Sequence, residues 1–378
     1  MKKFLIIIFA LIGLVSCSKQ IAGTDGFEKT ITFKNSVERK ITTKANKGII
    51  ANTTFSYDDF GVYGYVKPNS DAIAAESETT NGGYLAKNAK YIKSGSIWVP
   101  ESGYYYWPKA DNISDIEVNF VAYAPYVAND GFDSTNDTIT IPIDATDMGA
   151  NCVDVLYAHK ENVNPTGDPV VLQFNHALSW IEFQGKYANN VKEVKITSIK
   201  FSSVLKGKGN LVLNVKNFSQ TVTDKTYDID PNFCDNIVLT AQDDGTGSVA
   251  YEVLSDMLVI PQDVPTQVTI TFNITLENTS GDEIHYNGRT VTRTINNGPD
   301  ANKQNDTSTG RDFVSTFEGG KKYVYRIFVT ANDITFNVNV DTWDEENPFQ
   351  VWDHNTTAYV EHFFGEASML MVKNSVIA

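Results

Sequence analysis

The stretch Ile334-Thr335-Phe336-Asn337-Val338-Asn339-Val340-Asp341 alternates apolar and polar residues along its whole length. Successive side chains of a β-strand point to opposite faces, so this period of two predicts a strand with one buried face and one polar face. Between residues 27 and 343 the chain has almost no helical periodicity, and many short β-branched or aromatic runs are separated by Asn, Asp, Gly and Pro. The sequence therefore predicts an all-β protein.

Fourteen other runs have the composition of strands, and the chain is too long for one ordinary core. Two tandem β-sandwiches are expected, joined near residues 162–169, where Pro165 and Pro169 leave few backbone donors for a sheet. The other predicted strands cover residues 30–35, 55–66, 97–107, 117–124, 138–142, 153–158, 170–183, 194–204, 210–215, 236–240, 249–260, 267–276, 284–295 and 323–330. The expected limits are 17–165 for the N-terminal domain, 166–345 for the C-terminal domain and 346–378 for a C-terminal tail.

The N-terminus has the pattern of a signal peptide, expected to span residues 1–16. Lys2 and Lys3 precede an uncharged apolar stretch at residues 4–15. A transmembrane helix is the alternative, but it needs about 20 apolar residues. The run Leu14-Val15-Ser16-Cys17 resembles the lipobox of bacterial lipoproteins, which predicts lipidation of Cys17 and a lipid anchor in a bilayer.

The charge is acidic, with 46 Asp and Glu against 31 Lys and Arg. Nucleic acid and anionic membrane surfaces are poor partners for such a chain, because both repel it. The five histidines show no metal-binding spacing, and the common motifs of hydrolases, NTPases and dinucleotide enzymes are absent from the sequence. We expect no enzymatic activity, no cofactor and no metal site, and we interpret the oxygen-rich run at residues 130–137 as a solvated loop rather than a Ca²⁺ site. Cys152 and Cys234 could pair, but the sequence leaves this open.

Aromatic residues make up 12% of the chain and cluster at residues 104–107 and 120–126. Aromatic faces can stack on sugar rings, so Trp107 is a candidate glycan contact. Core packing is the alternative, because alternate residues of a strand point to opposite faces and about half of each cluster is then buried.

Several short segments occur in a fixed order that covers nearly the whole chain after the signal peptide. They are Tyr106-Trp107-Pro108, Phe120-Val121-Ala122-Tyr123-Ala124-Pro125, Asp154-Val155-Leu156-Tyr157-Ala158, Phe174-Asn175-His176-Ala177-Leu178-Ser179-Trp180-Ile181, Leu258-Val259-Ile260-Pro261-Gln262, Gly319-Gly320-Lys321-Lys322-Tyr323-Val324-Tyr325 and Val340-Asp341-Thr342-Trp343. Together they resemble the fimbrillin family of Bacteroidetes lipoproteins, the subunits and the tip or anchor proteins of fimbriae.

The resemblance implies two transthyretin-like, Greek-key β-sandwich domains, export as an outer-membrane lipoprotein and assembly by strand exchange. In stalk subunits of this family, a protease cuts after a basic residue past the first strand and removes that strand. A terminal strand of a neighbouring subunit then fills the vacated groove. The implied partners are other fimbrial subunits and a host or bacterial surface ligand.

The first strand, expected at about residues 27–35, fits this cycle. Phe27, Ile31 and Phe33 share one face, and their burial is worth roughly 5–9 kcal/mol as an upper estimate. Arg39 and Lys40 follow directly and are the expected cut site, although a plain solvated basic loop is the alternative reading.

The residues after Trp343 are apolar enough to need a partner, either on their own domain or as a donor strand in a neighbour. The candidate donor residues are Phe363, Met369, Leu370, Met371 and Val372. The leading hypothesis is a structural stalk or tip subunit that reaches the cell-surface fimbria after processing, and the alternative is a surface glycan-binding lipoprotein of a polysaccharide-uptake system.

Overall fold

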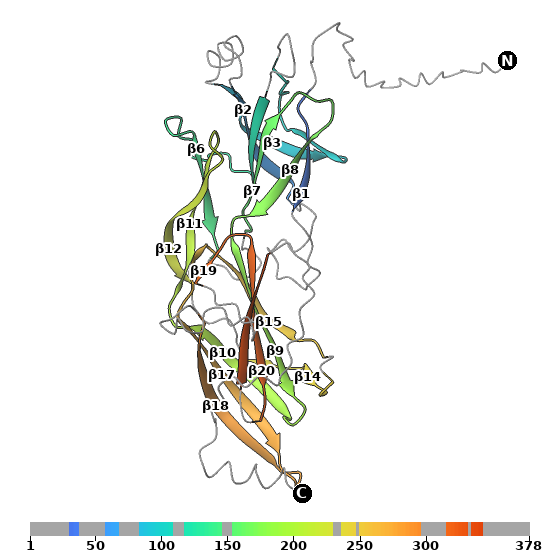
Figure 1. The fold of residues 1–378 in the computed structure, drawn as a ribbon, viewed down its shortest axis with the longest axis vertical. Helices are drawn as coiled ribbons and strands as arrows, with labels where there is room; N and C mark the ends of the chain where they lie inside the picture. Colours follow the sequence, from blue (N-terminus) through green and yellow to red (C-terminus); the bar gives the residue numbers. More distant parts are fainter. Residues whose placement is uncertain are drawn as a thin grey trace, which may run out of the picture.

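The computed structural model describes residues 30–37, 57–67, 83–108, 117–145, 153–229, 236–246, 249–295, 315–331 and 334–342. In these ranges every regular element is a β-strand, so the predicted all-β class is confirmed. The described part of the chain is elongated, with one group of strands at each end and a third group alongside the middle (Figure 1).

Seven strands of the first half form a sheet that closes on itself in the order β1-β4-β3-β2-β5-β7-β8. β8 comes after the expected linker in the sequence but pairs with β1 and β7 in this sheet. The seven strands are β1 Phe33–Val37, β2 Asp59–Lys67, β3 Tyr84–Ser94, β4 Ile97–Pro100, β5 Glu117–Ala124, β7 Leu156–Val163 and β8 Val170–His176.

The second half forms two main sheets that pack face to face. One has the order β13-β10-β17-β18, and the other has the order β14-β9-β20-β21 with β15 also paired to β9. A short pair, β16 Gln262–Asp263 with β19 Thr316–Phe317, completes this half. The strands of the two main sheets are β9 Ser179–Ala188, β10 Glu193–Phe201, β13 Ile237–Val238, β14 Gln242–Asp243, β15 Glu252–Val259, β17 Gln267–Glu277, β18 Glu283–Thr294, β20 Lys321–Val329 and β21 Ile334–Thr342.

A three-stranded sheet joins the two halves. Its order is β12-β11-β6, with β6 at Thr138–Asp144, β11 at Leu205–Asn214 and β12 at Gln220–Ile229. β6 and β11 pair antiparallel along all of β6. Hydrogen bonding therefore crosses the expected boundary at residue 165 here as well as at β8, and the limits of the two domains remain a prediction.

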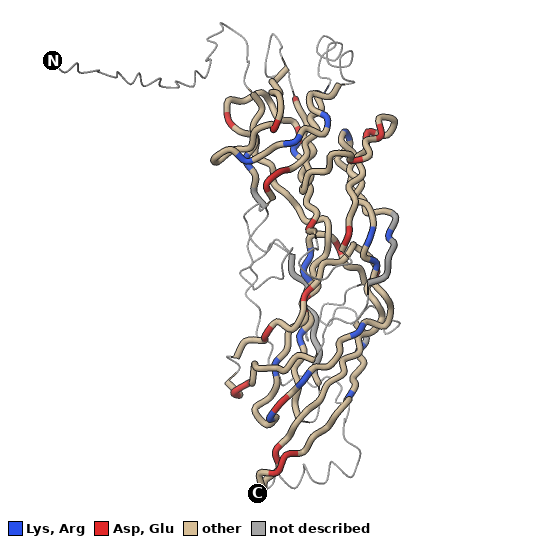
Figure 2. The backbone as a smooth tube through the Cα atoms, turned by 180° about the vertical axis from the view of Figure 1, so that it is seen from behind, with Lys and Arg blue, Asp and Glu red and all other residues tan. Residues whose placement is uncertain are grey.

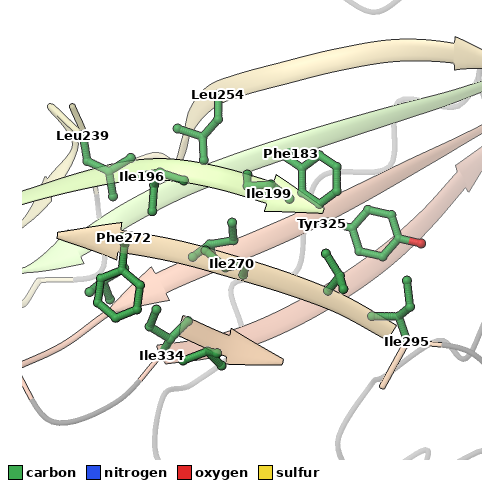
Figure 3. Close-up of a cluster of buried hydrophobic side chains, with 14 of the residues drawn as sticks. Phe183, Ile196, Ile199, Leu239, Leu254, Ile270, Phe272, Ile295, Tyr325 and Ile334 are labelled. Carbon is green, nitrogen blue, oxygen red and sulfur yellow. The ribbon is translucent and has the colours of Figure 1, made fainter. Parts of the chain in front are cut away.

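Three clusters of buried apolar side chains hold these sheets together. The N-terminal core fills the closed sheet and includes Phe33, Phe60 and Phe120. The middle core lies between the outer face of β2 and β5 and the sheet of β6 and β11, and includes Tyr63 and Tyr123. The C-terminal core lies between the two large sheets of the second half (Figure 3).

β5 shows why its sequence is a continuous apolar run rather than an alternating one. Phe120 and Ala122 point into the N-terminal core, whereas Val121 and Tyr123 point into the middle core. Both faces of the strand are thus buried, and a strand buried on both faces has no polar positions to alternate.

Acidic and basic residues are spread along both halves of the described backbone (Figure 2). Within the described ranges we find no helix with the length and apolar character that crossing a bilayer requires.

A slot filled by the first strand

The candidate functional site is the slot that β1 fills, because β1 is the strand through which the first sheet closes. On one side β1 pairs in parallel with β8, from Phe33 opposite Val170 to Val37 opposite Phe174. On the other side it pairs with β4 where Phe33 lies opposite Trp98. The hydrogen-bonding edges of β4 and β8 would both be open without β1.

The inward side chains of this segment are completely buried. Ile31 is 1% exposed and Phe33 is 0% exposed. The Phe33 ring makes edge-on contacts with the rings of Tyr91, Phe120 and Phe60, at centroid distances of 4.8, 5.2 and 6.1 Å. Edge-to-face packing is a favourable aromatic geometry at these distances. The centre of the slot is therefore an aromatic pocket that fits one large ring.

The chain that leads into β1 is held by backbone hydrogen bonds. The amide of Ile31 donates to the carbonyl of Tyr105 at 2.7 Å, and Thr30 forms an isolated bridge with Tyr106. The amide of Val170 donates to the carbonyl of Thr32 at 2.9 Å. Residues 105–106 and Val170 therefore hold the strand at the entrance of the slot through main-chain contacts. Any strand that enters the slot could form the same contacts.

The outward face of β1 is polar, as the alternation predicts. Lys34 is exposed, opposite Val171 of β8, which is also exposed. Asn35, by contrast, lies on the same side of the strand as Phe33 and is partly buried; the amide orientation that satisfies both of its groups has its oxygen accepting from the Trp98 indole nitrogen at 3.3 Å. The contrast between Phe33 and Lys34 fixes the register, because a slip of one residue would bury the lysine.

A buried side-chain hydrogen bond holds the far end of β8. The Nδ1 atom of His176 lies 2.8 Å from Oδ2 of Asp154, and both side chains are at most 1% exposed. The Tyr57 hydroxyl donates to the backbone carbonyl of Asp154 at 2.6 Å. These contacts connect β8 to the residues before β7 and β2, so that one wall of the slot is fixed independently of β1.

Of the site residues predicted from the sequence, Ile31 and Phe33 lie in this slot, pointing inward. Trp107 is described below, and the remaining predicted site residues lie outside the described residues, as do Cys152 and Cys234. They are Cys17, Phe27, Arg39, Lys40, Phe363, Met369, Leu370, Met371 and Val372.

The structure corrects the prediction for Trp107. Its side chain is 2% exposed and packs on Phe120 at a centroid distance of 6.0 Å, within the N-terminal core. A buried ring cannot stack on a sugar, so the prediction of a glycan contact at Trp107 does not agree with the structure.

Sequence reasoning missed the lining of the slot. Phe60, Tyr91 and Phe120 come from three strands, and only the pairing of those strands brings them together. The available signal was local, namely alternation around Tyr91 in Ala89-Lys90-Tyr91 and an apolar run around Phe120, and it does not identify which rings meet.

The carboxylates of the 130–137 loop are engaged by tyrosines. The Tyr63 hydroxyl donates to Asp130 at 2.7 Å, and the Tyr84 hydroxyl donates to Asp137 at 2.6 Å. Burial, followed by the hydrogen bond to Asp130, raises the pKa of Tyr63 well above its ordinary range. These pairs attach the loop to the outer face of β2 and β3.

The sequence matches the model of the family described as "Fimbrillin-like" over residues 43–343. The matched range begins after β1 and ends directly after β21, so β1 and the tail take no part in the match. A search of curated proteins finds no match.

Solved structures resemble the chain at low sequence identity. A fimbrial protein from Bacteroides vulgatus aligns with a TM-score of 0.51 and 16% identity, over 82% of this chain and 99% of that one. A "putative cell adhesion protein" from Bacteroides ovatus aligns with a TM-score of 0.48 and 19% identity, over 85% and 99% of the two chains. Another from Bacteroides uniformis gives 0.44 and 18%, over 83% and 98%. The alignment with the Bacteroides vulgatus protein shows a similarity of fold.

Proposed function

Since this chain belongs to the fimbrillin-like family, we propose that it is a structural, non-enzymatic subunit of a fimbria that serves cell adhesion. We further propose that subunits join by strand exchange in the slot that β1 fills. In this proposal the two halves of the chain are transthyretin-like sandwiches, and the subunit belongs to the stalk or the tip.

The observation that carries the proposal is the position of β1. It closes the first sheet and it is short. Its covalent connections to the rest of the chain lie before Thr30 and after Val37. Burial of Ile31 and Phe33 contributes roughly 3–6 kcal/mol as an upper estimate, which is comparable to the total stability of many domains. A subunit that lost β1 would gain this stabilisation again by accepting an equivalent strand.

The remaining steps follow the order of the chain. In the proposal, Cys17 carries the lipid that delivers the protein to the outer membrane, and cleavage after Arg39 or Lys40 separates β1 from the lipid-free body. The lipid is then a delivery tag for a stalk subunit, and the mature protein leaves the membrane for the cell-surface fimbria.

The donor is proposed to be the C-terminal tail of a neighbouring copy. The pocket around Phe33 sets a chemical requirement, because it presents the rings of Tyr91, Phe120 and Phe60 to the incoming side chain. An aromatic or a thioether side chain meets this requirement, since sulfur also packs well on ring edges. Phe363, Met369 and Met371 offer these chemistries.

Limited trypsin digestion tests the proposal. The full chain, beginning at Cys17 and made without lipid, is cut near Arg39 and then analysed for ladders that resist mild denaturant. Cleavage is expected to convert monomers into ladders, and deletion of residues 357–378 is expected to prevent them. Replacement of Arg39, Lys40, Lys44 and Lys47 by Ser removes the trypsin sites of this segment and serves as the uncut control.

The proposal fails for a stalk subunit if the cut protein loses the β1 peptide and still remains monomeric. A protein that is cut but keeps the peptide bound would instead show that strand release needs a partner. Mass spectrometry of the N-terminus on intact cells separates a stalk subunit, which begins near Ile41, from an anchored one, which retains acylated Cys17.

A further inference from the structure

Beside the slot, residues 104–107 alternate between two environments. The Tyr105 ring stacks on Tyr91 at a centroid distance of 6.3 Å, and Trp107 is buried against Phe120. The rings between them point outward, and Tyr104 is 71% exposed and Tyr106 is 46% exposed. The partly buried Tyr105 and the buried Trp107 hold the backbone, so the outward rings lie on a segment anchored to the N-terminal core.

These two rings form a pair at the surface. Their centroids are 6.3 Å apart and their planes are tilted by 43°. Among the described residues, Tyr104 and Tyr106 have the largest exposed fractions of all Phe, Tyr and Trp side chains. Exposed neighbouring aromatic rings are unusual for a surface that only meets water, and tyrosine is enriched where proteins bind each other.

The pair lies at the entrance of the slot. The backbone of Tyr105 and Tyr106 pairs with Ile31 and Thr30, the residues that lead into β1. β1 is parallel to β8, and β8 continues through Ala177 into β9 of the second half. The entrance is therefore at the end of the closed sheet that faces away from the second half (Figure 1).

We propose that Tyr104 and Tyr106 are the contact surface for the neighbouring copy of this chain whose tail fills the slot. This inference rests on the proposed function and adds to it a surface outside the slot. A strand that enters here pairs with the backbone of residues 105 and 106. The body of the donor subunit then arrives at the two outward rings.

The geometry favours a protein over a sugar. A sugar face stacks best on a flat ring, and two rings tilted by 43° do not form one plane. The two exposed rings instead offer surface against which side chains of a partner can pack, as tyrosines do in protein interfaces. A second copy that donates its tail to the slot would also reach Tyr104 and Tyr106, because these rings lie beside the exchanged strand.

The test compares trypsin-cut full chains for the rate of ladder formation. The double change Tyr104→Ala and Tyr106→Ala is expected to slow ladders at least about tenfold, because central interface tyrosines often contribute that much. The double change to Phe is expected to restore most of the rate, since the rings and not the hydroxyls make the proposed contact. Val238→Ala, at a position 46% exposed on β13, is the matched surface control.

Thermal unfolding of each uncut variant must match the wild type, and because both rings point outward it is expected to do so. Hydroxyl-radical footprinting gives a second readout, in which Tyr104 and Tyr106 become protected in wild-type ladders while Tyr105 does not change.

Each outcome has a separate meaning. If the wild type forms ladders and the alanine variant forms them at the same rate, the contact surface is refuted while strand exchange stands. If the alanine variant forms normal ladders but loses wild-type retention on a polysaccharide gel, the rings bind sugar and the inference is wrong. If the cut wild type forms no ladders, strand exchange fails and the inference fails with it.

Discussion

Phe33 concentrates the stabilising contacts of the first strand on one side chain. Three rings surround it, and no part of it is exposed. A truncation there removes the apolar contacts and leaves a cavity that the surrounding rings cannot easily fill, since they belong to three different strands.

Phe33→Ala in the uncut chain is therefore expected to lower the free energy of unfolding by about 3–5 kcal/mol. Chemical denaturation followed by circular dichroism measures the change. Lys34→Ala, on the exposed face of the same strand, is the control and is expected to stay within about 0.5 kcal/mol of the wild type. Equal effects of the two changes would mean that the inward face of β1 does not stabilise the protein.

His159 of β7 gives the protein a dependence on pH at the residue scale. Its ring lies between Tyr157 and Phe218, at centroid distances of 5.6 and 5.4 Å, and its buried Nε2 atom has no hydrogen-bond partner. Burial lowers the pKa of His159 from 6.5 to about 4. The folded state therefore binds this proton less readily than the unfolded state does.

Stability is expected to be unaffected by His159 above pH 6.5 and to fall as the pH decreases from 6.5 to 4. A shift of this size corresponds to at most about 3 kcal/mol. His159→Phe keeps the ring contacts and is expected to remove this part of the decrease, as seen in unfolding curves at several pH values. Val171→Ala, at an exposed position on β8 with no titratable group, is the control for substitution itself and is expected to keep the wild-type decrease. A profile that is identical in His159→Phe would contradict the assignment.

At the scale of the elements, the strands that could be predicted are those with an unbroken pattern. β21, β17 and β5 were predicted to within about one residue at each end, because each shows either regular alternation or a continuous apolar run. β3 was missed. Its buried residues are Tyr84, Ala86, Ala89 and Tyr91, so the period of two is interrupted near Asn88, which has a φ of 44° and lies at a bulge.

Two other differences have related causes. The run at residues 170–183 was predicted as one strand, but β8 ends at His176 and β9 begins at Ser179. Ala177 and Leu178, between them, are buried, so apolar composition does not mark the break. The slot had only a local signal in the sequence, namely the inward pair Ile31 and Phe33, because pairing with β8 and β4 is a long-range property.

The pairing of β6 with β11 leads to a prediction about coupling between the halves. Leu211 comes from the second half of the sequence but is buried in the middle core opposite Ile141. Leu211→Ala is expected to destabilise the protein by about 2–5 kcal/mol and to lower hydrogen-exchange protection in β2 and β5 as well as in β11. Val268→Ala, in the C-terminal core, should leave protection in β2 and β5 unchanged. If Leu211→Ala affected only the second half, the two halves would not be coupled through this sheet.

For the whole molecule, the proposed function divides the described residues into β1, which is proposed to exchange, and the body that holds its slot. The middle core and the β6–β11 ladder join the two halves, and the His176–Asp154 pair fixes one wall of the slot. Removal of β1 should therefore leave an open slot that keeps its shape. This is the condition for another strand to enter without refolding of the subunit.

A synthetic peptide of residues 27–37 tests this condition directly. Added in excess to trypsin-cut protein, it is expected to occupy the slot and stop ladders from growing, because it restores both main-chain pairing with β8 and the Phe33 ring in its pocket. The same peptide carrying Phe33→Ala should need at least about a tenfold higher concentration, since it leaves the pocket empty. A scrambled peptide is the control for general effects of peptide. If the Phe33→Ala peptide stopped the ladders as well as the native one, recognition would reside in the backbone alone. The aromatic pocket would then not select the donor.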